Sequence, residues 1–140
     1  MSLRGFSTIS FWADDLAAAR AWYADLLGVD AYFERSGPDG SAAYVEFRVG
    51  DSQDELGIID GRYRPASASA EPGGAVMHWH VDDLDATVVR LLAMGAKEFM
   101  PVTVRGEGFS TASVVDPFGN VLGVMTNPHY LEVLAATSAA

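Results

Sequence analysis

The sequence predicts an α+β fold of two tandem βαβββ modules whose curved mixed sheets surround a cavity. Two internal repeats predict it. The segment Trp12–Leu16 recurs as His80–Leu84, 68 positions later, and each copy follows an alternating apolar run and precedes helical spacing. The run Leu56–Ile59 recurs as Leu122–Met125, 66 positions later. Both halves therefore share a first and a last strand, and two copies of one open sheet can face each other across a concave space.

The first module is expected over residues 5–60. It begins with a strand at Ser7–Trp12, in which apolar and polar side chains alternate. A helix follows, for which the Asp14-Asp15 pair supplies an N-cap, and its apolar stripe runs from Leu16 to Leu27 before Gly28 ends it. Three further strands, separated by turns rich in glycine and aspartate, are predicted at Ala31–Arg35, Ala42–Val49 and Glu55–Asp60.

The second half repeats this order after a connector. Residues 61–74 are rich in alanine, serine, proline and glycine without an apolar period, which is typical of a connecting segment. In the second module, residues 75–127, Asp83 caps the helix and Gly95 closes it. The tail, residues 128–140, is expected to be helical through Leu134, and the whole chain, residues 1–140, is interpreted as one domain. The strands are predicted at Val76–Val81, Lys97–Val104, Ser110–Val115 and Val121–Thr126.

The composition limits the classes of function. The chain has 140 residues and no cysteine, which excludes disulfides and a thiol nucleophile. No stretch approaches the roughly 18 apolar residues of a membrane span, and the start lacks the apolar core of a signal peptide, so we expect a cytoplasmic protein without a membrane partner. The net charge of −10, with the 9 Lys and Arg residues scattered, opposes a nucleic-acid partner.

Several motifs carry a family resemblance. The two βαβββ modules, the Asp-Asp-Leu that opens each helix and the sequence Asp116–Asn120 before the last strand resemble the vicinal oxygen chelate superfamily. This group contains glyoxalase I, bleomycin-resistance proteins and extradiol dioxygenases, and the resemblance covers nearly the whole chain. It implies the fold of these proteins. It leaves the activity open, because the fold hosts isomerases, lyases, dioxygenases and proteins that only bind a drug.

The resemblance also implies where a metal would be held. Metal-using members have a histidine near the start of the first strand of a module and a glutamate in its last strand. The histidine positions fall on Thr8 and Val76, and the glutamate positions fall on Gly57 and Gly123. None of the four can supply the usual imidazole or carboxylate, so we expect no metal and no cofactor. A small shift in register would make Glu55 the carboxylate of the first module.

Strand alternation predicts which side chains line the cavity, because successive side chains of a strand point to opposite faces. Ile9 and Phe11, like Met77 and Trp79, are apolar and are expected beneath the helices. The opposite face is polar and aromatic, unlike a core. The predicted ligand-binding residues are Thr8, Ser10, Trp12, Tyr44, Glu46, Arg48, His78 and His80.

Three interpretations of His78 and His80 stay open. Both point to one side of a strand, so together with Glu46 or Glu55 they would form a three-ligand metal set. As imidazoles they can also hold a ligand or move a proton, or they can be hydrogen-bonded structural residues. Arg48 likewise has two interpretations, which are an ion pair on a solvated face and a two-pronged contact with a ligand carboxylate or phenolate.

The leading functional hypothesis is a metal-independent homodimer that binds a small, partly aromatic or apolar molecule without turnover, as in the bleomycin-resistance branch. The alternative is an enzyme of the same superfamily, namely a lyase, isomerase or dioxygenase. Such an enzyme would use a displaced metal site or acid–base chemistry by His78 and His80. A purely structural interaction module agrees poorly with the polar inward faces. Whether the cavity closes within one chain or across two is left open.

Overall fold

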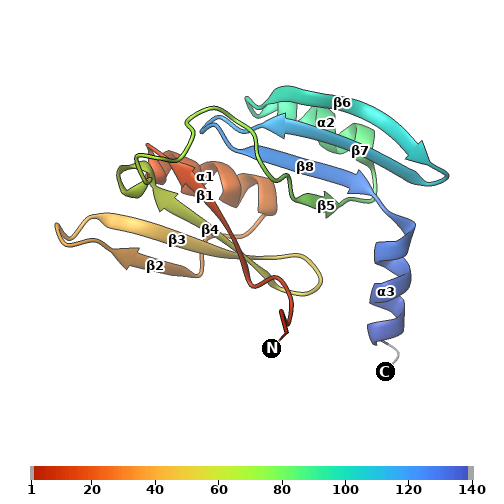
Figure 1. The fold of residues 1–140 in the computed structure, drawn as a ribbon, viewed down its shortest axis with the longest axis horizontal. Coiled ribbons are helices and arrows are strands. Elements are labelled where there is room, and N and C mark those ends of the chain that lie inside the picture. Colours follow the sequence, from red (N-terminus) through yellow and green to blue (C-terminus); the bar gives the residue numbers. More distant parts are fainter. Residues whose placement is uncertain (1, 139–140) are drawn as a thin grey trace. The chain divides into compact units, whose positions relative to one another are not determined.

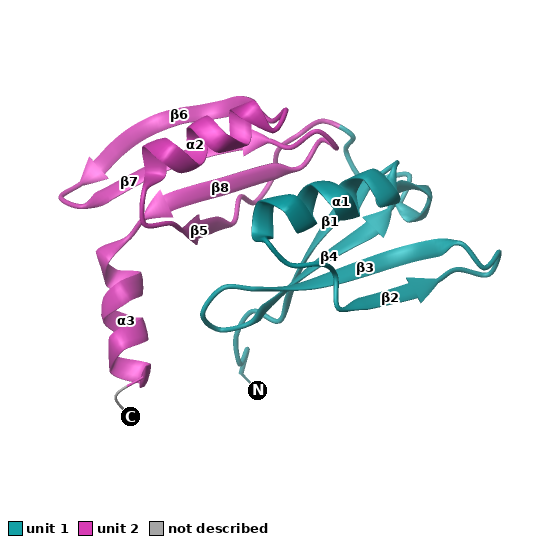
Figure 2. Ribbon diagram, turned by 180° about the vertical axis from the view of Figure 1, so that it is seen from behind, with its two compact units in different colours: residues 1–70 teal, residues 71–140 magenta. Residues whose placement is uncertain are grey.

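In the computed structural model, which describes residues 2–138, the chain forms two compact units that divide between Ala70 and Glu71 (Figure 2). Each unit is a four-stranded mixed sheet with a helix packed against it (Figure 1). The division falls inside the segment 61–74 that we expected to connect the modules. Residues 139 and 140, the end of the expected tail, lie outside the described residues. A single domain over all 140 residues stays a prediction.

Unit 1 has the predicted βαβββ order. Its sheet order is β1-β4-β3-β2, in which β1 and β4 are parallel and the other neighbours are antiparallel. A single turn of 3-10 helix, η1, follows the last strand. The elements are β1 (Thr8–Ala13), α1 (Leu16–Leu27), β2 (Phe33–Ser36), β3 (Ala42–Val49), β4 (Asp54–Asp60) and η1 (Gly61–Tyr63).

The helix α1 has the predicted limits and covers one face of this sheet. The Asp15 carboxylate accepts a hydrogen bond from the Ala18 backbone N–H, and Gly28 ends the helix with a φ of 72°, which favours glycine. Tyr23 of α1 is fully buried. The strand residues that face α1 keep at most 1% of their surface exposed. They are Val45, Phe47, Leu56 and Ile58. The hydrophobic core of unit 1 therefore lies between α1 and one face of β3 and β4.

Unit 2 repeats the βαβββ order, with the sheet order β5-β8-β7-β6, and adds a C-terminal helix. Its first strand is shorter than the predicted Val76–Val81, because only three residues pair with β8. The last helix continues past Leu134 through two alanines, the strongest helix formers. The elements are β5 (His78–His80), α2 (Leu84–Ala93), β6 (Lys97–Gly106), β7 (Phe109–Val115), β8 (Val121–Thr126) and α3 (Pro128–Ser138).

Both units confirm the predicted fold class. They form two four-stranded mixed sheets with three helices, which is the α+β arrangement of two βαβββ modules. Within residues 2–138, none of the helices is long and apolar enough to cross a membrane.

The turn between β7 and β8 depends on the buried carboxylate of Asp116, whose exposed fraction is 3%. Its Oδ1 accepts hydrogen bonds from the backbone N–H groups of Phe118 at 2.9 Å and Asn120 at 2.8 Å. Its Oδ2 accepts from the Asn120 side-chain amide at 3.0 Å. Gly119 has a φ of 95°, which other residues rarely adopt. The Asp-Pro-Phe-Gly-Asn motif is therefore a self-bonded turn.

We expect Asp116→Ala to lower the free energy of unfolding by about 1–3 kcal/mol, because buried donors then lose their acceptor. Urea denaturation followed by circular dichroism measures the change. Glu107→Ala is the control, since Glu107 is exposed in the turn between β6 and β7. An equal, small effect of both substitutions would contradict this role of Asp116.

Candidate functional site

The face of the unit 1 sheet opposite α1, here called the open face, holds the six predicted residues of this unit. Cross-strand register arranges its side chains in three rows. Because side chains on one face repeat every second residue, the alternation that buries Val45 and Phe47 exposes these rows. The rows are Arg35, Tyr44, Ile59 and Trp12; then Phe33, Glu46, Gly57 and Ser10; then Arg48, Glu55 and Thr8.

The third row is a closed polar network around Glu55. The Thr8 hydroxyl donates to Oε2 of Glu55 at 2.6 Å, and Nη1 of Arg48 donates to Oε1 at 2.9 Å. The Thr8 hydrogen bond, with the Arg48 charge, holds the pKa of Glu55 below its usual value. The Arg48 guanidinium also lies over the Tyr32 ring, 4.8 Å from its centre. Arg48 is therefore already paired with an anionic side chain, that of Glu55.

In the middle of the open face, Tyr44 and Glu46 form a second pair. The Tyr44 hydroxyl donates to Oε1 of Glu46 at 2.6 Å. Burial raises the pKa of both groups, and the charge of Glu55 adds to each shift. The Tyr44 ring lies over Gly57, where an added Cβ would be 2.5 Å from the Tyr44 hydroxyl oxygen. Glycine at position 57 thus leaves room for the Tyr44 ring.

A pocket of about 580 Å³ lies at the β2 side of the open face. Phe33 and Tyr63 line it while keeping 45% and 43% of their surface exposed. Arg35 is the positive charge in its wall, and no carboxylate lines it. Most of the residues that line this pocket were not among the ligand-binding residues predicted from the sequence. The lining consists of Phe33, Arg35, Ser36, Gly37, Pro38, Ala43, Tyr44, Ile59 and Tyr63.

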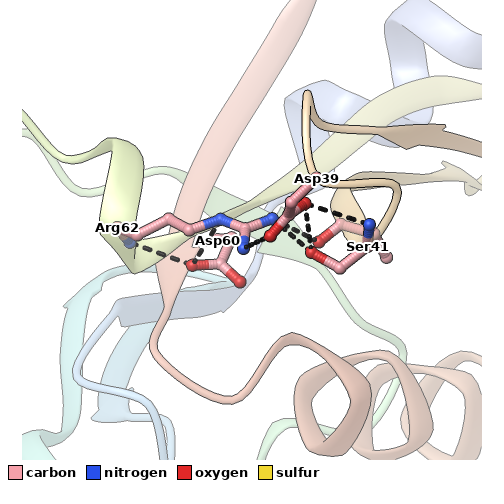
Figure 3. Close-up of polar contacts among 5 residues, drawn as sticks. Asp39, Ser41, Asp60 and Arg62 are labelled. Carbon is pink, nitrogen blue, oxygen red and sulfur yellow. Dashed lines mark hydrogen bonds and ion pairs between the residues drawn. The ribbon is translucent and has the colours of Figure 1, made fainter.

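Two walls of this pocket are joined by a polar cluster, here called the Arg62 clasp, formed by Asp39, Ser41, Asp60 and Arg62 (Figure 3). Arg62 Nη1 donates to Asp39 Oδ2 at 2.9 Å, and its Nη2 donates to the Ser41 hydroxyl at 2.8 Å. Asp60 accepts from the Arg62 backbone N–H at 2.9 Å. The clasp therefore fastens the β2–β3 turn to η1, which supplies Tyr63.

In unit 2, His78 and His80 lie on the sheet face opposite α2, where their partners on β8 are Gly123 and Met125. The His78 ring lies over Gly123, where a Cβ would be 2.9 Å from it and 2.7 Å from the Met77 carbonyl oxygen. Glycine at 123 thus leaves room for a ring, as it does at 57. Convergence of the two histidines with the predicted residues of unit 1 on one cavity stays a prediction.

His80 is tied to the start of α3. Its Nδ1 accepts a hydrogen bond from the Asn127 backbone N–H at 3.1 Å, and its ring stacks on Tyr130 with centres 4.9 Å apart. The side chain is 10% exposed and lines a cavity of about 220 Å³. Its Nε2 lies 3.5 Å from an Asp82 oxygen, in a geometry that makes no hydrogen bond. These contacts support the interpretation of His80 as a hydrogen-bonded structural residue.

A family model for the Glyoxalase/Bleomycin resistance protein/Dioxygenase superfamily matches residues 5–124. The chain belongs to this superfamily. The match confirms the resemblance drawn from the sequence motifs. No curated protein sequence matches the chain significantly.

Several solved structures have a similar fold. A glyoxalase-related enzyme from Fulvimarina pelagi has a TM-score of 0.68 at 18% identity, covering 90% of each chain. The antibiotic binding protein TnmS3 from a Streptomyces species has a TM-score of 0.65 at 22% identity, covering 89% of this chain and 96% of its own. A lactoylglutathione lyase from Agrobacterium tumefaciens has a TM-score of 0.65 at 21% identity, covering 92% and 98%. At these identities, the likeness concerns the fold alone.

The residues of this chain do not fit the metal-ligand set that the resemblance implies for metal-using members of the superfamily. Thr8 donates its hydroxyl to Glu55, whose other oxygen is taken by Arg48. Gly57 and Gly123 have no side chain, and the rings of neighbouring residues lie over both. Glu55 does lie opposite Thr8 in the parallel register. Within residues 2–138, no three His, Asp or Glu side chains are grouped to hold a metal ion.

Two kinds of information were needed to predict the pocket residues that were not identified from the sequence. Phe33 and Arg35 alternate on β2 and therefore share a face, a signal that is present in the sequence. Their position beside Tyr44 depends on the β2–β3 register, which contains an irregularity between Arg35 and Ser36. Tyr63 lies in the segment expected to be a connector, and it follows Arg62, whose clasp ties η1 to the β2–β3 turn beside the pocket.

We expect Gly123→Ala to destabilise the protein more than Gly57→Ala. At position 123 the new methyl group meets the Met77 carbonyl oxygen, which already accepts the Gly123 N–H, so backbone must move. At position 57 the obstacle is the Tyr44 side chain, which can shift. The loss for Gly123→Ala should be about 1–3 kcal/mol in the free energy of unfolding.

Gly73→Ala is the matched control for both substitutions, because nothing lies within 4 Å of the added Cβ. Chemical denaturation of the three variants measures the order. A Gly123→Ala protein as stable as the Gly73→Ala protein would contradict the close approach of Met77.

Proposed function

We propose that this protein binds a small, partly aromatic molecule in the pocket on the open face of unit 1, without turnover and without the usual metal of the superfamily. The pocket itself is the observation that supports this function most directly. Its volume of about 580 Å³ is in the range of small-molecule sites. Its walls are mainly aromatic and aliphatic, and the rings of Phe33 and Tyr63 are partly exposed in it. Such rings are suited to stacking against a flat ligand.

The residues at the four positions that the resemblance implies for a metal support binding rather than metal-dependent turnover. The positions that would hold a metal carry Thr8, Gly57, Val76 and Gly123, and a divalent ion needs imidazole or carboxylate donors instead. One similar structure, TnmS3, is described as an antibiotic binding protein. A binding role of that kind agrees with the pocket described above.

A different observation supports the enzymatic alternative. Glu46 accepts a hydrogen bond from Tyr44. Burial raises the pKa of Glu46, and the negative charge of Glu55 raises it further. Glu46 does not line the pocket, but Tyr44 does, so the carboxyl group would exchange a proton with a bound molecule through the Tyr44 hydroxyl. The alternative thus becomes acid–base chemistry by Glu46. It differs from the binding proposal in one respect, since the bound molecule would be recovered chemically changed.

We expect flat aromatic compounds to raise the melting temperature of the protein, equally with and without EDTA. Tyr63→Ala should weaken their binding by about 3- to 10-fold, because one stacking partner is lost. Thermal-shift screening finds the ligands, and calorimetry measures the affinities.

Protein purified without chelator should contain less than about a tenth of an equivalent of zinc, nickel, manganese or iron by elemental analysis.

Phe6→Ala is the matched control, because Phe6 is an aromatic residue that is fully exposed and lies outside the pocket. Its affinities should equal those of the wild type. Ligand binding that disappears with EDTA would overturn the metal-free proposal, and the absence of any aromatic ligand would overturn the binding proposal.

We further infer that the protein is a homodimer. The strand β6 is at the edge of its sheet, and four of its apolar side chains are 40% to 76% exposed. An exposed apolar edge strand is a template for pairing with another chain, and a second copy of this chain in a symmetric dimer would cover it. Light scattering at micromolar concentration should give twice the chain mass of 14.9 kDa. A particle of one chain mass would contradict the dimer. The apolar side chains are Phe99, Met100, Val102 and Val104.

A further inference from the structure

We propose that the molecule bound in the unit 1 pocket is a flat aromatic anion, an aromatic carboxylate or phenolate, and that Arg35 is the residue that selects its charge. This inference rests on the proposed function, because it specifies the ligand of the same pocket. It differs from one of the two sequence-based interpretations of Arg48, in which that arginine contacts the anion of a ligand.

The arginines of unit 1 differ in whether a carboxylate already neutralises them. Arg20 lies 3.0 Å from Asp30, Arg48 lies 2.9 Å from Glu55, and Arg62 lies 2.9 Å from Asp39. In the part of the chain that the structure describes, the Arg35 guanidinium forms no ion pair and no hydrogen bond with a carboxylate. An anion arriving at Arg48 would have to compete with Glu55. At Arg35 it would meet no protein carboxylate.

The charge of the pocket is opposite to the charge of the whole chain. The chain has 19 acidic and 9 basic residues, yet the lining of the pocket contains one arginine and no carboxylate. The acidic residues close to Arg35 in the sequence or on its face of the sheet have other partners. Asp39 is held in the Arg62 clasp (Figure 3), Glu34 lies 3.7 Å from Arg20, and Glu46 accepts the Tyr44 hydroxyl. None of these three carboxylates forms an ion pair with Arg35.

The position of Arg35 brings a guanidinium beside aromatic rings. It pairs with Tyr44 across β2 and β3, and Phe33 precedes it by two residues on the same face. A guanidinium presents a planar fork of donors that matches the two oxygens of a carboxylate. A ligand whose ring stacks in the pocket and whose edge carries a negative group satisfies both features at once. A neutral aromatic compound would satisfy only the rings.

The test compares naphthoate with its methyl ester, which has the same ring and no charge. Calorimetry is performed on the wild type, Arg35→Gln, Arg35→Lys, Arg48→Gln and Arg105→Gln. The wild type should bind naphthoate at least about tenfold more tightly than the ester, and Arg35→Gln should lose this preference because its affinity for naphthoate falls much more than its affinity for the ester. Arg35→Lys should retain part of the preference. Added salt should reduce the preference in the wild type.

The control Arg105→Gln removes the same charge from unit 2, where Arg105 donates to Thr111, and it should bind both compounds like the wild type. Equal affinity for acid and ester in the wild type would overturn charge selection and leave the pocket in place as a neutral site. A preference that survives Arg35→Gln and disappears in Arg48→Gln would move the anion contact to Arg48. If neither compound nor any other flat aromatic molecule binds, the proposed function fails together with this inference.

Discussion

The structure of each unit depends on one constraint, which is that a helix covers only one face of a sheet. In unit 1 the covered face buries Val45, Phe47 and Ile58 almost completely. Since side chains alternate between the two faces, a slip of one residue would exchange this core for polar groups. The apolar packing under α1 therefore fixes the register that aligns Thr8, Glu55 and Arg48 on the other face. The polar network and the pocket are consequences of how the core is packed.

Much of this arrangement could be predicted from the sequence, because it depends on local periodicity. The limits of α1 and of the strand Ala42–Val49, and the face on which Tyr44, Glu46 and Arg48 lie, follow from apolar spacing and capping residues. Contacts between strands could not be predicted, because spacing within one strand does not fix the register with another. For that reason the pairing of Arg48 with Glu55 and the position of Arg35 at the pocket emerged only from the structure.

The two glycines at the superfamily's carboxylate positions illustrate the same limit. From the sequence, Gly57 and Gly123 appeared only as missing ligands. In the structure an aromatic ring, from Tyr44 in one unit and His78 in the other, lies over each glycine. A glutamate at either position would therefore require the ring to move as well. A metal site could not be introduced here by supplying a single donor without a change at the neighbouring ring.

The Arg62 clasp separates the frame of the pocket from its lining. Its hydrogen bonds run between Asp39, Ser41, Asp60 and Arg62, none of which lines the pocket. The walls are thus preorganised, and a ligand need not meet the entropy cost of ordering them. Substitutions at Phe33 or Arg35 can then change what is recognised without disturbing the support beneath. Such a division between scaffold and recognition surface allows new specificities to evolve on an unchanged framework.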